Sequence, residues 1–373
     1  MKKTTIMLSI ILIAIIITGC TTTSNVVKET KQRPIKIGLF APLTGSAASW
    51  GQNVLAGAQL AVNEVNSQGG INGRKVILIA EDDKCSVEGA TAVKKLIEYD
   101  RVDAIVGSVC SAAAEPAVPI AQQEKIPVVL TIASAPELTI NRDYIFRNYP
   151  SNNYFGKAIA EYSYNILEKR KAAVLYSQNS YGTSIKDVFV KEFKKAGGEV
   201  VFIQGINDNQ KDFKTEIAKI KNTDADFLYI PIYPGPSLML IKQAKENDLD
   251  LQIIGGDSVA GEEIVESGYA DDLIVAEPAV DNPEEFAQRI HSISEYKDLQ
   301  LSTPTPIGYD ATRIIIEAMK KAGTESEALK NAIAETNYNG VSNKVITFDE
   351  QGDLEIARFK FQIVQNNKLV AIN

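Results

Sequence analysis

Residues Val102–Pro119 read VDAIVGSVCSAAAEPAVP, and this stretch decides the fold class of the chain. An apolar run at residues 104–106 stops at Gly107, and an alanine-rich helical segment begins at Ser111. The order of strand, tight turn and helix start is the building unit of open α/β sheets, and ligands bind at such turns. The first amides of the helix lack backbone acceptors and carry positive potential, so they suit a small anion such as a carboxylate. Ser111 would add a hydroxyl donor there.

The same alternation of apolar runs and helical segments extends over most of the 373 residues. Helices are predicted at residues 51–66 and 183–196, because their apolar residues recur at helical spacing and each segment ends near a glycine pair. Strands are predicted at residues 35–40, 76–80, 104–106, 127–131, 172–176, 200–203, 227–232, 252–254 and 273–276. This pattern predicts an α/β fold of two doubly wound lobes, each with a parallel sheet covered by helices on both faces.

The chain is expected to pass between the lobes at three places. Two are the polar stretches RNYPSNNY (147–154) and EPAVDNP (277–283), and the third lies in the tail, where residues 345–372 alternate like paired strands around a turn at residues 349–353. Lobe 1 is then expected to hold residues 34–148 and 280–345, and lobe 2 residues 149–279 and 346–373. Residues 309–336 between the last two crossings read as two helices. Three short crossings form a hinge about which rigid lobes open and close.

The N-terminus has the features of an export signal. A basic start is followed by an apolar stretch at residues 6–17, which is too short to span a bilayer as a stable helix. The sequence Ile-Thr-Gly-Cys that ends at Cys20 resembles the bacterial lipoprotein box. This resemblance implies that residues 1–19 are removed as a signal peptide, that Cys20 carries lipid, and that residues 20–33 form a polar tether. The protein is then expected on the extracytoplasmic face of the cell membrane; an uncleaved anchor or a plain signal peptide are the alternatives.

Composition and missing motifs exclude several classes of function. The net charge is −8, and loss of residues 1–19 would leave 37 basic and 47 acidic residues, which makes a nucleic acid a poor partner. The one histidine, His291, lies in a segment that reads as an exposed helix, and no nucleophile elbow, phosphate loop or dinucleotide fingerprint follows a strand. The acids at 81–83 and 349–353 fit strand-end and turn chemistry, with a metal site as the alternative. We expect a monomer that is not an enzyme and uses no cofactor or metal.

The cysteines fit an exported protein. If Cys20 is lipidated, Cys85 and Cys110 remain as an even pair in an oxidising compartment. A disulfide between them would tie two strand ends together beside the expected anion site. Two free buried thiols are the alternative.

Polar and aromatic residues follow the expected strands at the edge where a ligand would bind. They are Ser111, Ser134, Tyr181, Tyr233 and Asp257, and Trp50 lies just before the first helix. A zwitterion needs donors for its carboxylate and an acid for its ammonium, and charge-assisted bonds of this kind are strong. The alternatives are that the serines and the aspartate cap helices and that the aromatic residues are core or rim packing.

The ordered set of motifs resembles the leucine/isoleucine/valine-binding family of periplasmic-type solute receptors. The motifs are IGLFAPLTG (37–45), VNSQGGINGRKV (65–76), EDDKC (81–85), VGSVCS (106–111), ASAPELT (133–139), NSYG (179–182), KDF (211–213) and YDA (309–311). The resemblance implies the type I periplasmic binding fold and a lipoprotein that closes on an amino acid, aliphatic or branched-chain, and delivers it to an ABC permease. A sensor for an amino acid or amide, without transport, is the alternative.

The resemblance also implies a role for individual residues. Ser111 and Ser134 would bind the α-carboxylate through hydroxyls and backbone amides. The Ile132 carbonyl, next to Ala133, and the Ser134 hydroxyl would accept from the ammonium, and Asp257 would neutralise it. Tyr181 and Tyr233 would close over the ligand, and Trp50 would pack against it.

Three positions depart from the family pattern. Ser134 stands where threonine is frequent, Asp257 is one methylene shorter than the usual glutamate, and Trp50 is bulkier than the usual tyrosine. These changes preserve the frame for an α-amino acid and leave open a smaller aliphatic, a polar or an amide-like ligand.

Overall fold

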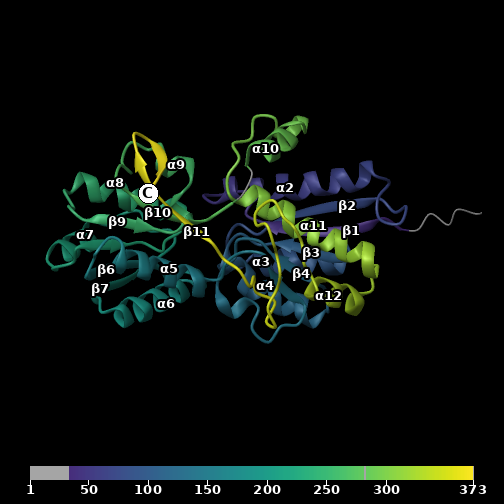
Figure 1. The fold of residues 1–373 in the computed structure, drawn as a ribbon, viewed down its shortest axis with the longest axis horizontal. Helices are drawn as coiled ribbons and strands as arrows, with labels where there is room; N and C mark the ends of the chain where they lie inside the picture. The colour runs from purple at the N-terminus through teal and green to yellow at the C-terminus, as the bar shows by residue number, and fades with distance from the viewer. Residues whose placement is uncertain (1–32, 281–282, 373) are drawn as a thin grey trace, which may run out of the picture. The chain divides into compact units, whose positions relative to one another are not determined.

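The computed structural model describes residues 33–280 and 283–372. The expected signal peptide, the lipidation at Cys20 and nearly all of the tether lie outside this part. Residues 34–373 form one compact unit that contains two sheets, each with its own helices (Figure 1). No helix in the described ranges is both long enough and apolar enough to cross a membrane.

The first sheet is entirely parallel, with the strand order β2-β1-β3-β4-β5. Its strands are β1 (Ile35–Ala41), β2 (Val76–Asp82), β3 (Ala104–Gly107), β4 (Val128–Leu130) and β5 (Ile145–Arg147). The helices of this lobe are α2 (Ala48–Ser67), α3 (Gly89–Lys94), which runs into a π-helical turn (Lys95–Tyr99), α4 (Ser111–Gln123), α10 (Pro283–His291), α11 (Pro304–Ala322) and α12 (Ser326–Ala334), with 3-10 turns at Pro136–Leu138 and Ser294–Tyr296.

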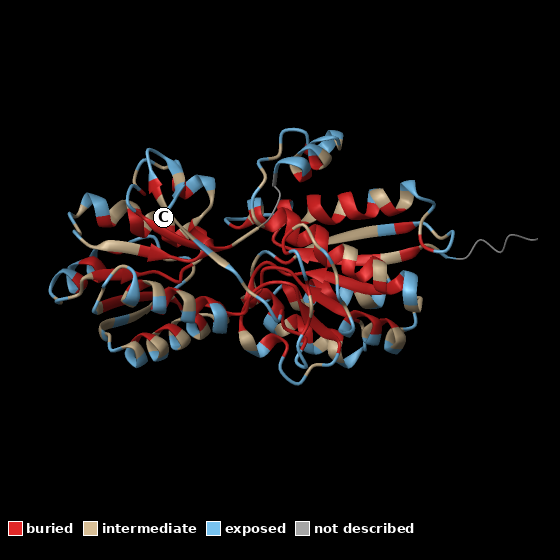
Figure 2. Cartoon of the chain, viewed as in Figure 1, coloured by how far each residue is buried: buried red, intermediate tan, exposed pale blue. Residues whose placement is uncertain are grey.

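Helices cover both faces of this sheet. Because successive side chains of a strand point to opposite faces, one strand contributes to two cores. In β1, Ile37 and Leu39 pack in one core with residues of α2 and α11. Phe40 packs in a second core with residues of α3 and α4 on the opposite face. Nearly all residues of β1, β3, β4 and β5 are therefore buried, whereas β2, at the edge of the sheet, is mostly half-buried (Figure 2).

Two glycines allow α2 and α11 to pack backbone against backbone. A Cβ atom on Gly57 would lie 2.0 Å from the Thr305 carbonyl oxygen, and one on Gly308 would lie 2.4 Å from the Val54 carbonyl oxygen. Any side chain at these positions would push the two helices apart.

The second sheet has the order β12-β11-β10-β9-β8-β6-β7. The pairs β10–β11 and β11–β12 are antiparallel, and the other pairs are parallel. Its strands are β6 (Lys171–Ser177), β7 (Glu199–Ile206), β8 (Phe227–Tyr229), β9 (Gln252–Gly255), β10 (Ile274–Pro278), β11 (Phe359–Gln365) and β12 (Lys368–Ala371). The helices are α5 (Asn152–Asn165), α6 (Ser180–Ala196), α7 (Lys214–Lys221), α8 (Pro234–Glu246) and α9 (Glu262–Val265), with a 3-10 turn at Asp257–Val259.

The second lobe repeats the two-core arrangement. In β8, Phe227 and Tyr229 pack against α5 and α6, whereas Leu228 packs in the core that includes α7 and α8. The expected fold class is therefore confirmed: two α/β lobes, each with helices on both faces of a largely parallel sheet.

Each strand expected from an apolar run is present, with ends shifted by a few residues. The helices expected at 51–66 and 183–196 are α2 and α6, and the pair expected within 309–336 is α11 and α12. Strand β5 was not expected, because its three residues precede the polar stretch that indicated a crossing. His291 is exposed at the end of α10, as expected.

The tail differs from the expected pattern. Residues 346–354, which we expected in lobe 2, pack in lobe 1. Ile346 and Leu354 lie in its core, and the backbone of Asp353 forms a β-bridge with that of Arg147 at the end of β5. Across the turn at residues 349–353, the two flanking segments are joined by one bridge, between Phe348 and Leu354. The regular pair is β11 and β12, joined at Asn366-Asn367, both of which have positive φ. Two such residues form the turn that suits the twist of a hairpin, so this dipeptide was the signal that the sequence reading missed.

Candidate ligand-binding site

Residues from both lobes enclose one small cavity. It contains about 380 Å³ of space between atoms, including its opening to solvent. Its lining consists of Ala47, Trp50, Val109, Cys110, Ser111, Ile132, Ser134, Tyr181, Tyr233, Pro234, Asp257 and Ser258. Of the residues expected around a ligand, only Ala133 is not in this lining. It is fully buried, and its N–H and carbonyl are bonded to Ser108 and Arg147.

The turn between β3 and α4 is held by a buried serine and a buried acid. The Ser108 hydroxyl donates to Asp83 Oδ2 at 2.5 Å and accepts from the Cys110 N–H at 3.1 Å. Asp83 Oδ1 accepts the Cys85 N–H at 2.8 Å. Burial raises the pKa of Asp83 to about 6, and the hydrogen bond from Ser108 opposes this shift. The acid that was considered for a metal site is thus used to hold the turn.

The predicted disulfide between Cys85 and Cys110 is confirmed, with the two Cα atoms 5.2 Å apart. It closes a loop with a sequence separation of 25. Loop closure of this size stabilises the folded state by about 3.5 kcal/mol in the chain-entropy treatment. The disulfide and the Asp83–Ser108 pair together make the start of α4 a rigid part of lobe 1.

Ser111, the first residue of α4, connects the helix to the segment after β4. Its Oγ accepts the N–H groups of Ser134 and Ala135, each at 3.1 Å. The Ser134 amide, which was expected to face a ligand carboxylate, therefore bonds to Ser111 in this structure. The Ser111 hydroxyl proton remains available to a ligand, because the two contacts use only the oxygen's lone pairs.

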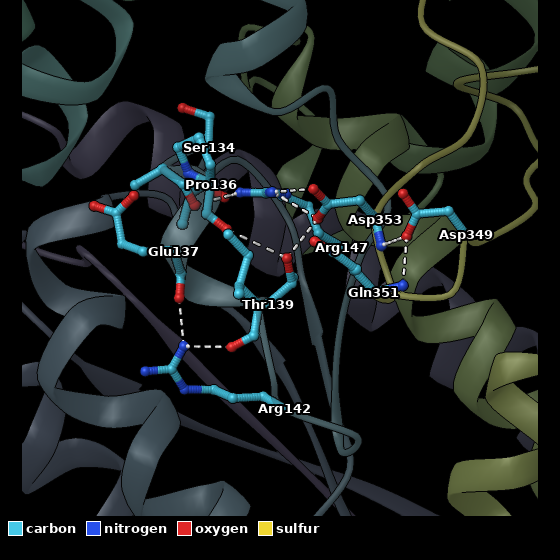
Figure 3. Close-up of polar contacts among 12 residues, drawn as sticks. Ser134, Pro136, Glu137, Thr139, Arg142, Arg147, Asp349, Gln351 and Asp353 are labelled. Atoms are coloured by element: carbon cyan, nitrogen blue, oxygen red, sulfur yellow. Dashed lines mark hydrogen bonds and ion pairs between the residues drawn. The ribbon is translucent and has the colours of Figure 1, made fainter. Parts of the chain in front are cut away.

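A buried ion pair contacts the segment around Ser134 (Figure 3). Arg147 Nη2 lies 2.6 and 2.7 Å from the two carboxylate oxygens of Asp353. Arg147 Nη1 donates to the carbonyls of Ala133 and Ala135, at 3.3 and 2.8 Å. Thr139 donates to Asp353 Oδ1 at 2.9 Å. The end of β5, the residues on either side of Ser134 and the tail are joined in one network.

Asp349, the first acid of this tail turn, also has structural partners. Asp349 Oδ1 accepts the N–H groups of Gln351 and Asp353, as a turn-forming aspartate does (Figure 3). Within the described residues, no group of three or more histidine, cysteine or acidic side chains is placed to hold a metal ion.

Lobe 2 contributes two stacked tyrosines to the cavity. The rings of Tyr181 and Tyr233 are nearly parallel, with centroids 5.2 Å apart. The Tyr181 hydroxyl donates to Ser258 Oγ at 3.2 Å, and the Tyr233 hydroxyl accepts the Ala112 N–H at 3.5 Å. The Tyr233 oxygen therefore lies at the N-terminus of α4, where the sequence predicted an anion. Burial raises the pKa of both tyrosines above the ordinary value, so they stay protonated.

Asp257 is the one acidic residue in the cavity lining, and it is 5% exposed. It begins the 3-10 turn after β9. Its Oδ1 accepts the Ser258 N–H at 2.8 Å, and its Oδ2 accepts the hydroxyl of Tyr149. Burial raises the pKa of Asp257 to about 6, and the hydrogen bond from Tyr149 opposes that shift. No cationic side chain of the described chain forms an ion pair with it, so a charged Asp257 favours a cationic ligand group.

Several contributing residues were not found from the sequence. Ser108, Arg147 and Tyr149 act on the site through other residues, and Ser258 lines it directly. Ser258 follows Asp257 and could have been included on that ground. Arg147 and Tyr149 lie in a stretch that was interpreted only as a crossing between lobes.

The chain is similar to known proteins in sequence and in fold. The family described as "Periplasmic binding protein" matches residues 34–367. The leucine-, isoleucine-, valine-, threonine- and alanine-binding protein of Pseudomonas aeruginosa is 30% identical, over 99% of this chain and 98% of its own length.

Solved structures give the same fold. The branched-chain amino acid transporter substrate-binding protein of Streptococcus pneumoniae, in complex with isoleucine, has a TM-score of 0.81 and 27% identity over 91% of this chain and 98% of its own. A solute-binding protein of an ABC transporter from R. palustris, in complex with benzoate, has a TM-score of 0.80, covering 91% of this chain and 95% of its own; at 23% identity it shows the fold alone.

The family match includes every residue of the cavity lining. The chain belongs to the periplasmic binding protein family, a family of binding proteins and not of enzymes.

Proposed function

We propose that this protein is an extracytoplasmic solute-binding lipoprotein that captures an aliphatic amino acid between its lobes and delivers it to an ABC permease. One observation carries the proposal: a single cavity is lined by the carboxyl of Asp257 from lobe 2 and by Ser111 at the N-terminus of α4 from lobe 1. These are the partners that the ammonium and the carboxylate of an α-amino acid require. Because they come from different lobes, a bound zwitterion favours the closed form.

The rest of the lining suits a small apolar side chain. Trp50, Val109, Ile132 and Pro234 present apolar surface beside the polar groups. Burying such a side chain contributes about 1.5–3 kcal/mol to binding, because its surface leaves water. The bulk of Trp50 limits the length of the side chain, so we expect valine-, isoleucine- or leucine-sized ligands and not aromatic amino acids.

Two of the similar proteins bind amino acids, which supports an amino acid as the ligand of this protein. A third binds a carboxylic acid without an amine, which suggests another class of ligand. The relatives above bind leucine, isoleucine, valine, threonine and alanine in one case and isoleucine in another. Benzoate, held by the R. palustris protein, has a carboxylate but no cation. Such a ligand would leave Asp257 buried without a countercharge, which is costly in a closed cavity.

Calorimetric titration of the protein with defined ligands tests the proposal. We expect leucine, isoleucine or valine to bind with a Kd of about 10 μM or tighter, because two charge-assisted contacts and an apolar contact form together. Benzoate is expected to bind at least about a hundredfold more weakly, since it leaves Asp257 unpaired. Endogenous ligand is first removed by unfolding in guanidinium, dialysis and refolding. Tight binding of benzoate with no heat from any amino acid would overturn the proposal.

The lipid anchor and the transport role rest on the N-terminal sequence, which lies outside the described residues. We expect mass spectrometry of the protein from its native membrane to find a mature chain that begins at a diacylated Cys20, and the Cys20→Ser variant to be released from the membrane fraction. Cells that lack the protein are expected to lose high-affinity uptake of the amino acid it binds. Unchanged uptake would favour the sensor alternative, and a retained N-terminal signal would exclude the lipoprotein form.

A further inference from the structure

The first crossing between the lobes contacts the ligand cavity at several points. Arg147 holds the carbonyls on either side of Ser134, and the Asn152 N–H donates to the Ser134 carbonyl at 2.8 Å. Asn152 Nδ2 also donates to the Tyr181 carbonyl at 3.1 Å. Between these two residues lies Tyr149, whose hydroxyl donates to the Asp257 carboxylate. The segment that joins the lobes therefore contacts three residues of the proposed site. They are Ser134, expected to bind the ligand carboxylate, Tyr181, expected to cover the ligand, and Asp257, expected to bind the ammonium.

Tyr149 is fixed by aromatic packing on the hinge side. It is fully buried, and its ring lies 5.8 Å from that of Phe155 at the start of α5. Phe155 in turn packs edge-on against Phe359, where the third crossing enters β11, at 4.7 Å. The Tyr149 ring is not in the cavity lining, so the hydroxyl acts on a ligand through Asp257.

The geometry points to Tyr149 as the positioning residue of an ammonium site, which sets the Asp257 carboxylate so that the cavity selects ligands with a cationic amine. This inference rests on the proposed function, because it assumes an amine-bearing ligand. The hydroxyl of Tyr149 and the N–H of Ser258 bond to different oxygens of Asp257. One lone pair remains on each oxygen, so the carboxylate can accept two N–H groups of an ammonium.

The hydrogen bond also favours the charged form of Asp257. Burial raises the pKa of Tyr149 well above its ordinary value, so its hydroxyl remains a donor. A donor stabilises the carboxylate and not the carboxylic acid, and it therefore lowers the pKa of Asp257 against the effect of burial. The negative charge of Glu277 from β10 raises the pKa of Asp257 and so acts in the opposite direction to Tyr149. The two other titratable groups that face Asp257 are Tyr181 from α6 and Tyr229 from β8, and the Asp257 charge raises the pKa of both.

The sign of the pH effect follows from these contacts. The amine ligand binds the charged carboxylate, so affinity is full above a pKa of about 6 and falls as the pH drops through it. For the unmodified protein this means leucine binding about tenfold weaker at pH 5 than at pH 7.5. Without the Tyr149 hydroxyl the pKa of Asp257 rises, and the loss of affinity begins at a higher pH.

The test compares Tyr149→Phe with the unmodified protein, using leucine and its amine-free analogue 4-methylpentanoate over pH 5–8. We expect the variant to bind leucine about five- to twentyfold more weakly at pH 7, with the midpoint of the pH profile moved up by about one unit. Binding of 4-methylpentanoate is expected to stay within about twofold. The matched control is Tyr144→Phe, because the Tyr144 hydroxyl bonds to Glu327 of α12, outside the cavity; it should leave both ligands and the pH profile unchanged.

A second comparison separates positioning from a general loss of packing. In the background Asp257→Asn, the further change Tyr149→Phe is expected to have no added effect on leucine binding, because the hydroxyl acts through the carboxylate. An unchanged Kd and pH midpoint in Tyr149→Phe, or an equal loss for both ligands, would overturn the inference while the proposed function stands. A protein that binds no amine ligand at any pH would overturn both.

Discussion

The Asp257→Asn variant is expected to bind its amino acid at least about tenfold more weakly and yet to be more stable than the unmodified protein when no ligand is present. The loss of affinity follows from removal of the one acidic side chain in the cavity lining. A neutral amide cannot compensate an ammonium in a site that excludes water, and charge-assisted bonds are the strong ones. Calorimetry with leucine at pH 7.5 measures this part of the prediction.

The gain in stability has a defined sign. The pKa of Asp257 is raised from 3.8 to about 6 in the folded protein, so folding disfavours its charged form. This cost is absent at a pH below the pKa of Asp257 in the unfolded chain. It reaches its full size, about 3 kcal/mol, at a pH above the pKa of Asp257 in the folded protein. Asparagine carries no charge and can bond to both Tyr149 and Ser258. We therefore expect a higher melting temperature for the variant at pH 7.5, and a difference that vanishes as the pH falls towards 4.

Glu277→Gln is the matched control for this variant. Glu277 is also a buried acid of lobe 2, but it lies outside the cavity lining and pairs with Lys360 at 3.4 Å. Its replacement is expected to change the Kd by no more than about threefold, because no direct contact with the ligand is lost. An unchanged Kd in Asp257→Asn would remove Asp257 from the site. A lower melting temperature would show that its charge is needed for folding.

Arg147→Met is expected to destabilise the protein by about 3–5 kcal/mol, the largest loss from any single change considered. The guanidinium is fully buried, and burial lowers its pKa while the Asp353 carboxylate opposes that shift. Methionine has similar length but no charge, so Asp353 would remain largely buried without its partner. The carbonyls of Ala133 and Ala135 would also lose a donor, and the segment that carries Ser134 would become less ordered. Urea unfolding at pH 7.5, together with leucine titration, measures both effects.

Two further variants separate the ion pair from general disturbance of this region. Arg142→Met removes a half-buried arginine whose bonds to nearby carbonyls (Figure 3) are exposed, and it is expected to cost less than about 0.5 kcal/mol. The double variant Arg147→Met/Asp353→Leu removes both buried charges and should recover much of the stability lost in the single one. If the single and double variants were equally unstable, the cost would come from lost packing and not from an unpaired carboxylate.

The fold class and most of the residues that line the candidate cavity could be predicted, because each follows from a short stretch of sequence. An apolar run such as Ala104–Val106 is buried on both faces and lies next to the start of a helix, so a strand, a turn and a helix can be inferred from neighbouring residues alone. Ser111, Ser134 and Asp257 each follow a strand of a parallel sheet, and the carboxyl ends of such strands share one edge. That they line a single cavity is consistent with this rule.

No short-range sequence pattern identifies the residues that act on the site through other residues. Tyr149 and Asp257 are 108 positions apart, and Arg147 and Asp353 are 206 positions apart. Whether a tyrosine in a polar stretch faces a carboxylate depends on how two lobes and three crossings come together. Hydrophobic periodicity reports only which face of a segment is buried, and not which remote polar group it contacts there.

The alternation of strands and helices, and the strand ends that carry Ser111, Ser134 and Asp257, could thus be inferred from the sequence, since each depends on a short-range pattern. The disulfide partners could be inferred because Cys85 and Cys110 are the two cysteines that remain after Cys20. The contacts of the first crossing with Asp257 and with the Ser134 segment, and the packing of residues 346–354 in lobe 1, could be found only in the folded chain. The physical reason is that buried charges and hydroxyls require partners, and those partners come from whichever segments the completed fold places beside them.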